Sequence, residues 1–160
     1  TFWRLRTMLA LWGIVFIANL VGVCASVFLV DNAGLAKPDQ IAAFLEVSHH
    51  LADRSAAANI ALGVPAGFLL AALVWGLADM KSGRLLFIIA VTYVIALGEF
   101  SHVVAGSAEV ALLTLHGDMG VGQAFTQFVF PTLLGNILGG TGLFALLAYG
   151  QVRHEIIEES

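Results

Sequence analysis

The stretch that decides the fold is Leu85 to Leu115, LLFIIAVTYVIALGEFSHVVAGSAEVALLTL. It is longer than the roughly 20 apolar residues that cross the hydrocarbon core of a bilayer as a helix. Glu99, His102 and Glu109 lie near its middle. A charge at the bilayer centre costs about 2.5–3.5 kcal/mol on insertion scales, so such residues usually face a cavity or another protein segment. The stretch therefore indicates a membrane-spanning segment whose charged residues face a cavity or another protein segment.

Two interpretations of this stretch remain open. In the more economical one, half-helices at about 85–98 and 107–116 flank an irregular segment that holds His102, and Ser107 caps the second half-helix. Broken helices at mid-membrane are typical of transporter and channel sites. In the other, one long tilted helix runs through the stretch, and Glu99 pairs with the histidine three residues later.

The composition places the chain in a membrane. Of its 160 residues 59% are hydrophobic and 11% are charged, and the mean hydropathy is +0.93. A soluble domain carries about 25% charged residues to cover its water-facing surface.

The net charge of −4 argues against nucleic acid as a partner. We expect a single all-α transmembrane domain over residues 1–160, with spans at about 8–30, 56–78, 85–115 (broken near 98–107) and 125–149.

The distribution of positive charge predicts the orientation. Four crossings put both ends of the chain on one side, with five Lys and Arg residues there and two opposite, so both ends are predicted to be cytoplasmic. On the outer side, residues 38–54 begin with a proline and repeat apolar residues at helical spacing, which predicts a short amphipathic helix. The five are Arg4, Arg6, Lys81, Arg84 and Arg153, and the two are Lys37 and Arg54.

The first and last spans share a short motif. Residues 18–22 read ANLVG and residues 135–140 read GNILGG, so Asn19 and Asn136 lie 136 − 19 = 117 positions apart. The two helices run in opposite directions, as an inverted repeat requires. Each asparagine can pack helices, or bond an unwound backbone or pore contents, and both roles remain open. The repeat predicts six spans in the complete protein, of which this chain carries four.

Three segments resemble the formate/nitrite transporter family of membrane channels. Residues 99–106, EFSHVVAG, resemble the family motif Gly-Phe-Glu-His-Ser-(Ile/Val)-Ala-Asn around a central histidine. Pro131 and residues 135–140 resemble the last-helix motif, and residues 63–67, GVPAG, ahead of Trp75 resemble the Gly-x-x-x-Asn motif of the fourth helix. The resemblance covers essentially all of the chain as family helices three to six.

The resemblance implies an aquaporin-like inverted-repeat helix bundle with broken second and fifth helices, assembled as a homopentamer in the inner (plasma) membrane. It also implies that His102 faces the substrate path between two apolar constrictions. Three positions depart from the family pattern. Ser101 replaces a Glu while an acid stands instead at Glu99, and Gly106 and Gly67 each replace an Asn. With these three departures the chain is similar to members of a less-characterised branch of the family.

The resulting hypothesis is a channel or transporter for small monovalent anions or their weak acids. Apolar walls penalise a bare anion, and His102 can attract it as an imidazolium or hand it a proton. Glu99 either holds the histidine charged and relays its proton, or repels anions, and Ser101 lies next to the histidine in this path. The candidate constriction residues are Leu97, Phe100 and Val104, and the polar or repeat-motif positions are Asn19, Asn136, Gly67 and Gly106.

Other functions have weaker support in the sequence. A conduit for a small neutral solute and a non-transporting membrane scaffold remain as alternatives. An enzyme is not expected, because apart from the ionisable residues around His102 the sequence has no nucleophile–base pair and no phosphate loop. No cofactor and no metal site are predicted. The single cysteine, Cys24, lies in an apolar run and excludes an internal disulfide and a cysteine-based metal site.

Overall fold

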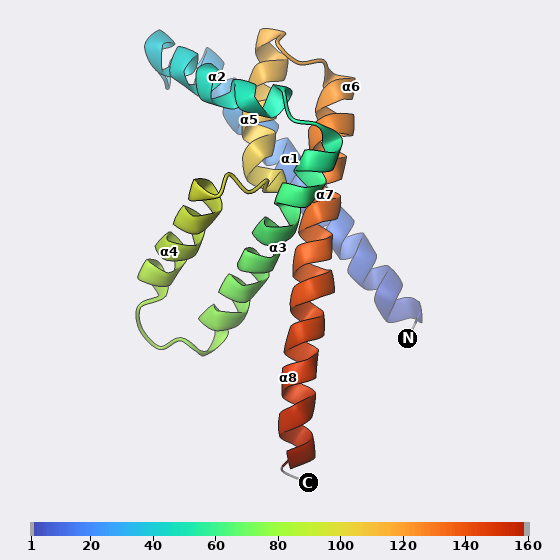
Figure 1. The fold of residues 1–160 in the computed structure, drawn as a ribbon. Helices are drawn as coiled ribbons and strands as arrows, with labels where there is room; N and C mark the ends of the chain where they lie inside the picture. Colours follow the sequence, from blue (N-terminus) through green and yellow to red (C-terminus); the bar gives the residue numbers. More distant parts are fainter. Residues whose placement is uncertain (1, 159–160) are drawn as a thin grey trace. The chain divides into compact units, whose positions relative to one another are not determined.

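The computed structural model describes residues 2–158, and this part of the chain is helical without any strand. The all-α fold expected from the sequence is therefore confirmed. The elements in chain order are α1 (Phe2–Asn32), α2 (Pro38–Ala52), α3 (Ala56–Asp79), α4 (Arg84–Leu97), α5 (Val103–His116), α6 (Val121–Gln123), the π-helix η1 (Ala124–Val129), α7 (Phe130–Ile137), the π-helix η2 (Leu138–Phe144) and α8 (Ala145–Glu158), as Figure 1 shows.

Within residues 2–158, three helical stretches are long and apolar enough to cross a membrane. They are Phe2–Asn32, Ala56–Asp79 and Val121–Gln151, and the last of them runs through the two π-helical segments. The stretch Leu85–Leu115 forms two shorter apolar helices, α4 and α5, with residues 98–102 between them. The helix break predicted from the sequence is thus present, and the alternative of one long continuous helix is wrong.

The helices group into two compact units. The first contains α1, α2 and nearly all of α5, and the second contains α3, α4, α7, η2 and α8. The break between α4 and α5 belongs to the second unit. The first unit comprises Thr1–Asp53 and Val104–Ala124, and the second comprises Arg54–Val103 and Phe125–Ser160.

In the first unit, α2 begins at a proline, the residue whose missing N–H costs nothing at a helix start. The N–H of Lys37 donates to Gln40 Oε1 at 2.9 Å, which fixes the entry into the helix. Ile41, Ser48 and Leu51 are buried, and their spacing places them on one face. The helix is therefore packed along one side, while its exposed side carries both polar residues and the apolar residues Phe44 and Val47.

Two histidine–aspartate contacts tie the elements of the first unit together. His116 Nε2 at the end of α5 lies 2.9 Å from Asp31 Oδ1 near the end of α1. His49 Nε2 of α2 lies 3.5 Å from Asp118 Oδ2 in the turn after α5. Both pairs are partly exposed, so they orient these helix ends more than they stabilise them.

In the second unit, α3 packs closely along α7 and η2, and these helices lie side by side in Figure 1. A Cβ added at Gly67 would overlap the carbonyl oxygen of Asn136, and one added at Gly139 would overlap that of Val64. Glycines four residues apart let two membrane helices approach until their backbones touch. On α3 they are Gly63 and Gly67, and on the partner helix Gly135 and Gly139.

Candidate functional site: the break between α4 and α5

The last turn of α4 sends the chain sharply out of the helix. The N–H of Phe100 donates to the carbonyl of Ile95 and that of Glu99 to the carbonyl of Ala96, both at 3.0 Å. This is the hydrogen-bond pattern of a Schellman motif, in which the residue after the helix has a left-handed backbone. Glu99 takes that place with a φ of 50°, where glycine is usual. The carboxylate is thus carried on the turn itself.

Ser101 is the most firmly held residue of the break. Its N–H donates to the carbonyl of Leu62 at 3.1 Å, and its Oγ donates to Asn59 Oδ1 at 3.1 Å. Asn59 is fully buried in α3 and donates in turn to the carbonyl of Gln127 at 2.7 Å. Because no water is available in the bilayer core, the backbone groups of a broken helix need such internal partners.

Asn136 of α7 closes the other side of the break. Its Oδ1 accepts the N–H of Val103 at 3.0 Å, while its Nδ2 donates to the carbonyls of Gly63 at 3.0 Å and Ser101 at 2.8 Å. The second half-helix consequently begins at Val103, and the expectation that Ser107 caps it is wrong. A side chain on another helix supplies the cap.

Arg54 compensates the charge of Glu99. Its Nη2 lies 2.5 Å from Glu99 Oε2, and its Nη1 donates to the Glu99 carbonyl at 3.1 Å. The arginine side chain is 15% exposed and the glutamate side chain 69%, so a largely buried cation holds an exposed carboxylate. Two bonds to one residue fix the turn as well as its charge. The cation immediately precedes α3, whose first turn is capped by the Ser55 hydroxyl.

The structure brings several of the predicted site residues together. His102 is half-buried between two residues whose backbones Asn136 holds. The Phe100 ring lies against Gly98, where an added Cβ would be 2.6 Å from the ring. Leu97 ends α4 and is 71% exposed. Ser101 and Asn136 thus meet at the break next to His102 in the chain, and Glu99 lies on the turn just before them, paired with Arg54.

Other predicted residues have different surroundings. Gly67 is buried against the Asn136 backbone, so the space that an asparagine side chain would need is filled by α7. Three positions belong to the first unit: Asn19 is exposed on α1, Val104 is half-buried on α5 and Gly106 is buried on α5.

The sequence analysis did not assign site roles to Arg54, Asn59 or Gln127. Asn59 is, like Asn19 and Asn136, an amide side chain inside an apolar span. This sequence feature could have identified Asn59 as a site residue. Arg54 was counted only for membrane orientation. Within residues 2–158, no three His, Cys, Asp or Glu side chains gather closely enough to hold a metal ion.

The fold and the site define an integral membrane protein built around a hydrogen-bonded helix break, the architecture of channels and transporters. The family model described as formate/nitrite transporter matches residues 3–150. The chain belongs to the formate/nitrite transporter family, a family of membrane transport proteins, as its motifs predicted.

The chain is also similar to inner membrane protein YfdC of Escherichia coli (strain K12), with 29% identity over 149 residues. The match covers 93% of this chain, which spans about half, 48%, of the relative's length. The prediction that the chain is similar to a less-characterised branch of the family is confirmed by this similarity to YfdC. No solved structure matches the chain significantly.

Proposed function

We propose that the chain forms part of a membrane pathway for small monovalent anions or their weak acids, with His102 as its pH-responsive residue. The break between α4 and α5 is the observation that carries the proposal. Ser101 and Val103, the neighbours of His102, are both held by Asn136. A histidine so anchored keeps one position relative to a passing solute, which proton transfer or charge attraction requires.

His102 has two ways to help an anion through an apolar segment. As an imidazolium about 4 Å from the anion, it attracts it by roughly 4 kcal/mol at an effective dielectric near 20. It can also give the anion a proton, after which the neutral acid crosses the dry segment without the cost of a buried charge. Both ways make the flux depend on pH.

The contact between Arg54 and Glu99 bears on the role of the relocated carboxylate. We propose that the pair is neutral as a whole and that Glu99 therefore does not repel anions approaching the break. The bonds from the arginine also hold the turn that precedes Ser101 and His102. Compensation by Arg54 makes an anion pathway compatible with an acid three residues before the histidine.

The proposal extends to the setting of the pathway. We place the protein in the inner membrane with both ends of this chain in the cytoplasm, as the distribution of positive charge predicts. A homopentamer is the proposed assembly, with Leu97, Phe100 and Val104 at the apolar constrictions. The large apolar surface of α1, which has no buried residue in this chain, supports packing against further protein or lipid.

The test is transport by the full-length protein in liposomes. We would follow internal pH after adding formate, nitrite, acetate, lactate or hydrosulfide, and compare the native protein with His102→Asn. His50→Asn is the matched control, because His50 is exposed on α2 outside the break. We expect at least one substrate to permeate, and expect His102→Asn to abolish the flux or shift its pH profile while His50→Asn leaves both unchanged.

Three outcomes would contradict parts of the proposal. A flux whose rate and pH profile survive His102→Asn would remove the histidine from the mechanism. A flux that ignores both pH and membrane potential would favour the conduit for a neutral solute. Absence of permeation by folded, oligomeric protein would leave a membrane scaffold as the better description.

A further inference from the structure

Asn59 connects the helix break to the last apolar span, Val121–Gln151. It lies in α3 and has no exposed surface. Its Oδ1 accepts the hydroxyl of Ser101 at 3.1 Å, and its Nδ2 donates to the carbonyl of Gln127 in η1 at 2.7 Å. An asparagine amide has an acceptor oxygen and two donor hydrogens, so one side chain serves both contacts. Asn59 thereby links the residue before His102 to the backbone of another span.

A proline explains why the last span offers this carbonyl to a side chain. Pro131 is buried in the first turn of α7, directly after the π-helix η1. Proline has no backbone N–H, so residue 131 donates nothing to the carbonyl four residues earlier, which is that of Gln127. In membranes, neighbouring helices supply hydrogen-bond partners at such places. Asn59 supplies one here, and the same amide holds Ser101.

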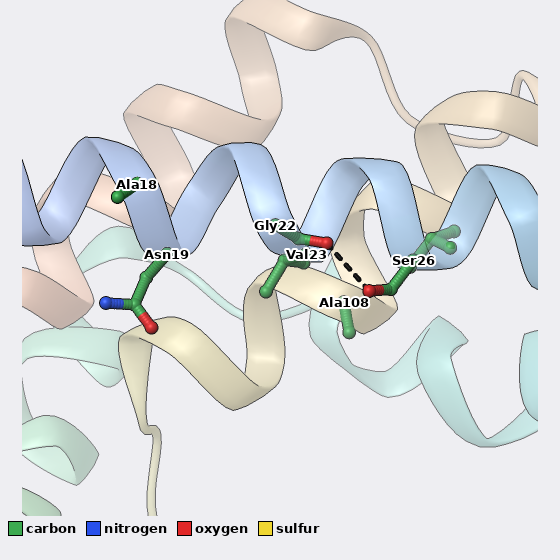
Figure 2. Close-up of a pocket in the computed structure, with 7 residues that line it drawn as sticks. Ala18, Asn19, Gly22, Val23, Ser26 and Ala108 are labelled. Carbon is green, nitrogen blue, oxygen red and sulfur yellow. Dashed lines mark hydrogen bonds between the residues drawn. The ribbon is translucent and has the colours of Figure 1, made fainter.

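These contacts differ from those of an asparagine that bonds only its own helix. Figure 2 shows such a residue, Asn19, which projects from α1 beside a groove. Within the part of the chain that the structure describes, its amide bonds only the carbonyl of Val15, four residues earlier, at 2.8 Å. The corresponding carbonyl for Asn59 is that of Ser55, yet the Asn59 side chain bonds two other segments. Its contacts therefore serve to join helices.

Asn136 makes the reciprocal connection from the last span to α3. Its Nδ2 donates to the carbonyl of Gly63 on α3 at 3.0 Å and to that of Ser101 at 2.8 Å. Gly63 lies about one helical turn after Asn59, so the two asparagines bridge the same pair of helices at different heights. Ser101 belongs to both bridges. A displacement of α3 along the last span must therefore move Ser101 or break one of these bonds.

We propose that Asn59 is a positioning residue for His102, and that through Ser101 it couples the backbone at Pro131 to the position of the imidazole. This inference deepens the proposed function and rests on it, because the position of the imidazole affects flux only if His102 serves the pathway. Asn59 acts on the histidine and not on the solute. Loss of the bridge should therefore change the rate and the pH profile of the flux, while the order of preference among solutes stays the same.

Nuclear magnetic resonance of the full-length protein in lipid bilayers tests the coupling at the histidine itself. Ring signals of isotope-labelled histidine report the surroundings of each imidazole, and the signal lost in His102→Asn belongs to His102. We expect Asn59→Leu to shift this signal. Pro131→Ala should shift it too, because an N–H at residue 131 competes with Asn59 for the Gln127 carbonyl. In the double variant the bridge is already broken, so Pro131→Ala should add no further shift.

Hydrogen exchange gives the magnitude of the effect. The amide of Ser101, which donates to the Leu62 carbonyl, should exchange about 5-fold to 150-fold faster in Asn59→Leu, the equivalent of about 1–3 kcal/mol. If Asn59→Leu does not fold, Ser101→Ala replaces it in the same cycle, because it removes the hydroxyl at the other end of the bridge. The controls are Asn32→Leu and Pro38→Ala, at the end of α1 and the start of α2, and both should leave exchange at Ser101 unchanged.

Two results would overturn the inference. One is a His102 signal that Asn59→Leu leaves unchanged, and the other is a shift from Pro131→Ala that persists in the double variant. Neither measurement requires transport, so failure here is distinguishable from failure of the proposed function, which the liposome assay detects. The expected responses of the His102 signal in a protein that conducts no solute would refute the pathway and support the positioning of His102 by Asn59.

Discussion

Replacing Asn136 with leucine is the most direct test of how the break is held. The change keeps a similar side-chain volume and removes three hydrogen bonds of 2.8–3.0 Å. Interhelical bonds in membranes average about 0.6 kcal/mol, and a buried group left without a partner costs about 1–3 kcal/mol. We therefore expect local opening of the break to become about 2–4 kcal/mol easier.

Hydrogen exchange of the full-length protein measures this effect where it arises. Because each 1.4 kcal/mol is a factor of ten, amides of residues 101–103 should exchange about 30-fold to 700-fold faster in Asn136→Leu. Asn32→Leu is the control, since Asn32 is exposed at the end of α1 and its amide bonds the Phe28 carbonyl of its own helix. Unchanged protection of residues 101–103 in Asn136→Leu would show that the break does not depend on this asparagine.

Two further predictions follow from the second unit. Gly67→Ala should destabilise the protein by about 1–3 kcal/mol or more in thermal unfolding, because its Cβ would overlap the Asn136 backbone, whereas Gly142→Ala, with nothing within 4 Å, should be neutral or stabilising. Arg54→Gln should slow anion uptake in liposomes about 3- to 10-fold by leaving Glu99 uncompensated, and adding Glu99→Gln should restore the rate. A double variant as slow as Arg54→Gln would assign the arginine a role independent of that carboxylate.

The location of the break could be predicted from the sequence, whereas the start of the second half-helix could not. Gly98 and Glu99 end an apolar run, which is a local signal, and α4 does end at Leu97. The restart at Val103 depends on an acceptor 33 positions away in the chain, on Asn136. Ser107 had the right local chemistry for a cap but lies inside α5.

The ion pair of Glu99 also depends on a residue far away in the chain, which local sequence does not predict. In the alternative of one continuous helix, sequence proximity made His102 the partner of Glu99, since residues three apart on a helix meet. The left-handed turn at Glu99 ends the helix, and the carboxylate pairs with Arg54, 45 positions earlier. The π-helical segments on either side of α7 likewise had no sequence signal beyond small residues such as Gly139, whose backbone approach to α3 depends on tertiary packing.

Two of the three departures from the family pattern, at Ser101 and Gly67, contribute to the scaffold of the break. With Ser101 in place of a glutamate, the position next to the histidine bonds buried Asn59 and becomes part of the scaffold. With Gly67 in place of an asparagine, α3 and α7 meet backbone to backbone. The negative charge stands instead at Glu99, on an exposed turn where Arg54 balances it. The residues on either side of His102, Ser101 and Val103, are thus held by neutral amide and hydroxyl bonds, while the charged pair holds the turn before them. A change in the solute that passes should therefore follow from altering the charges of Arg54 or Glu99 and not from altering the neutral bonds at Ser101 and Val103.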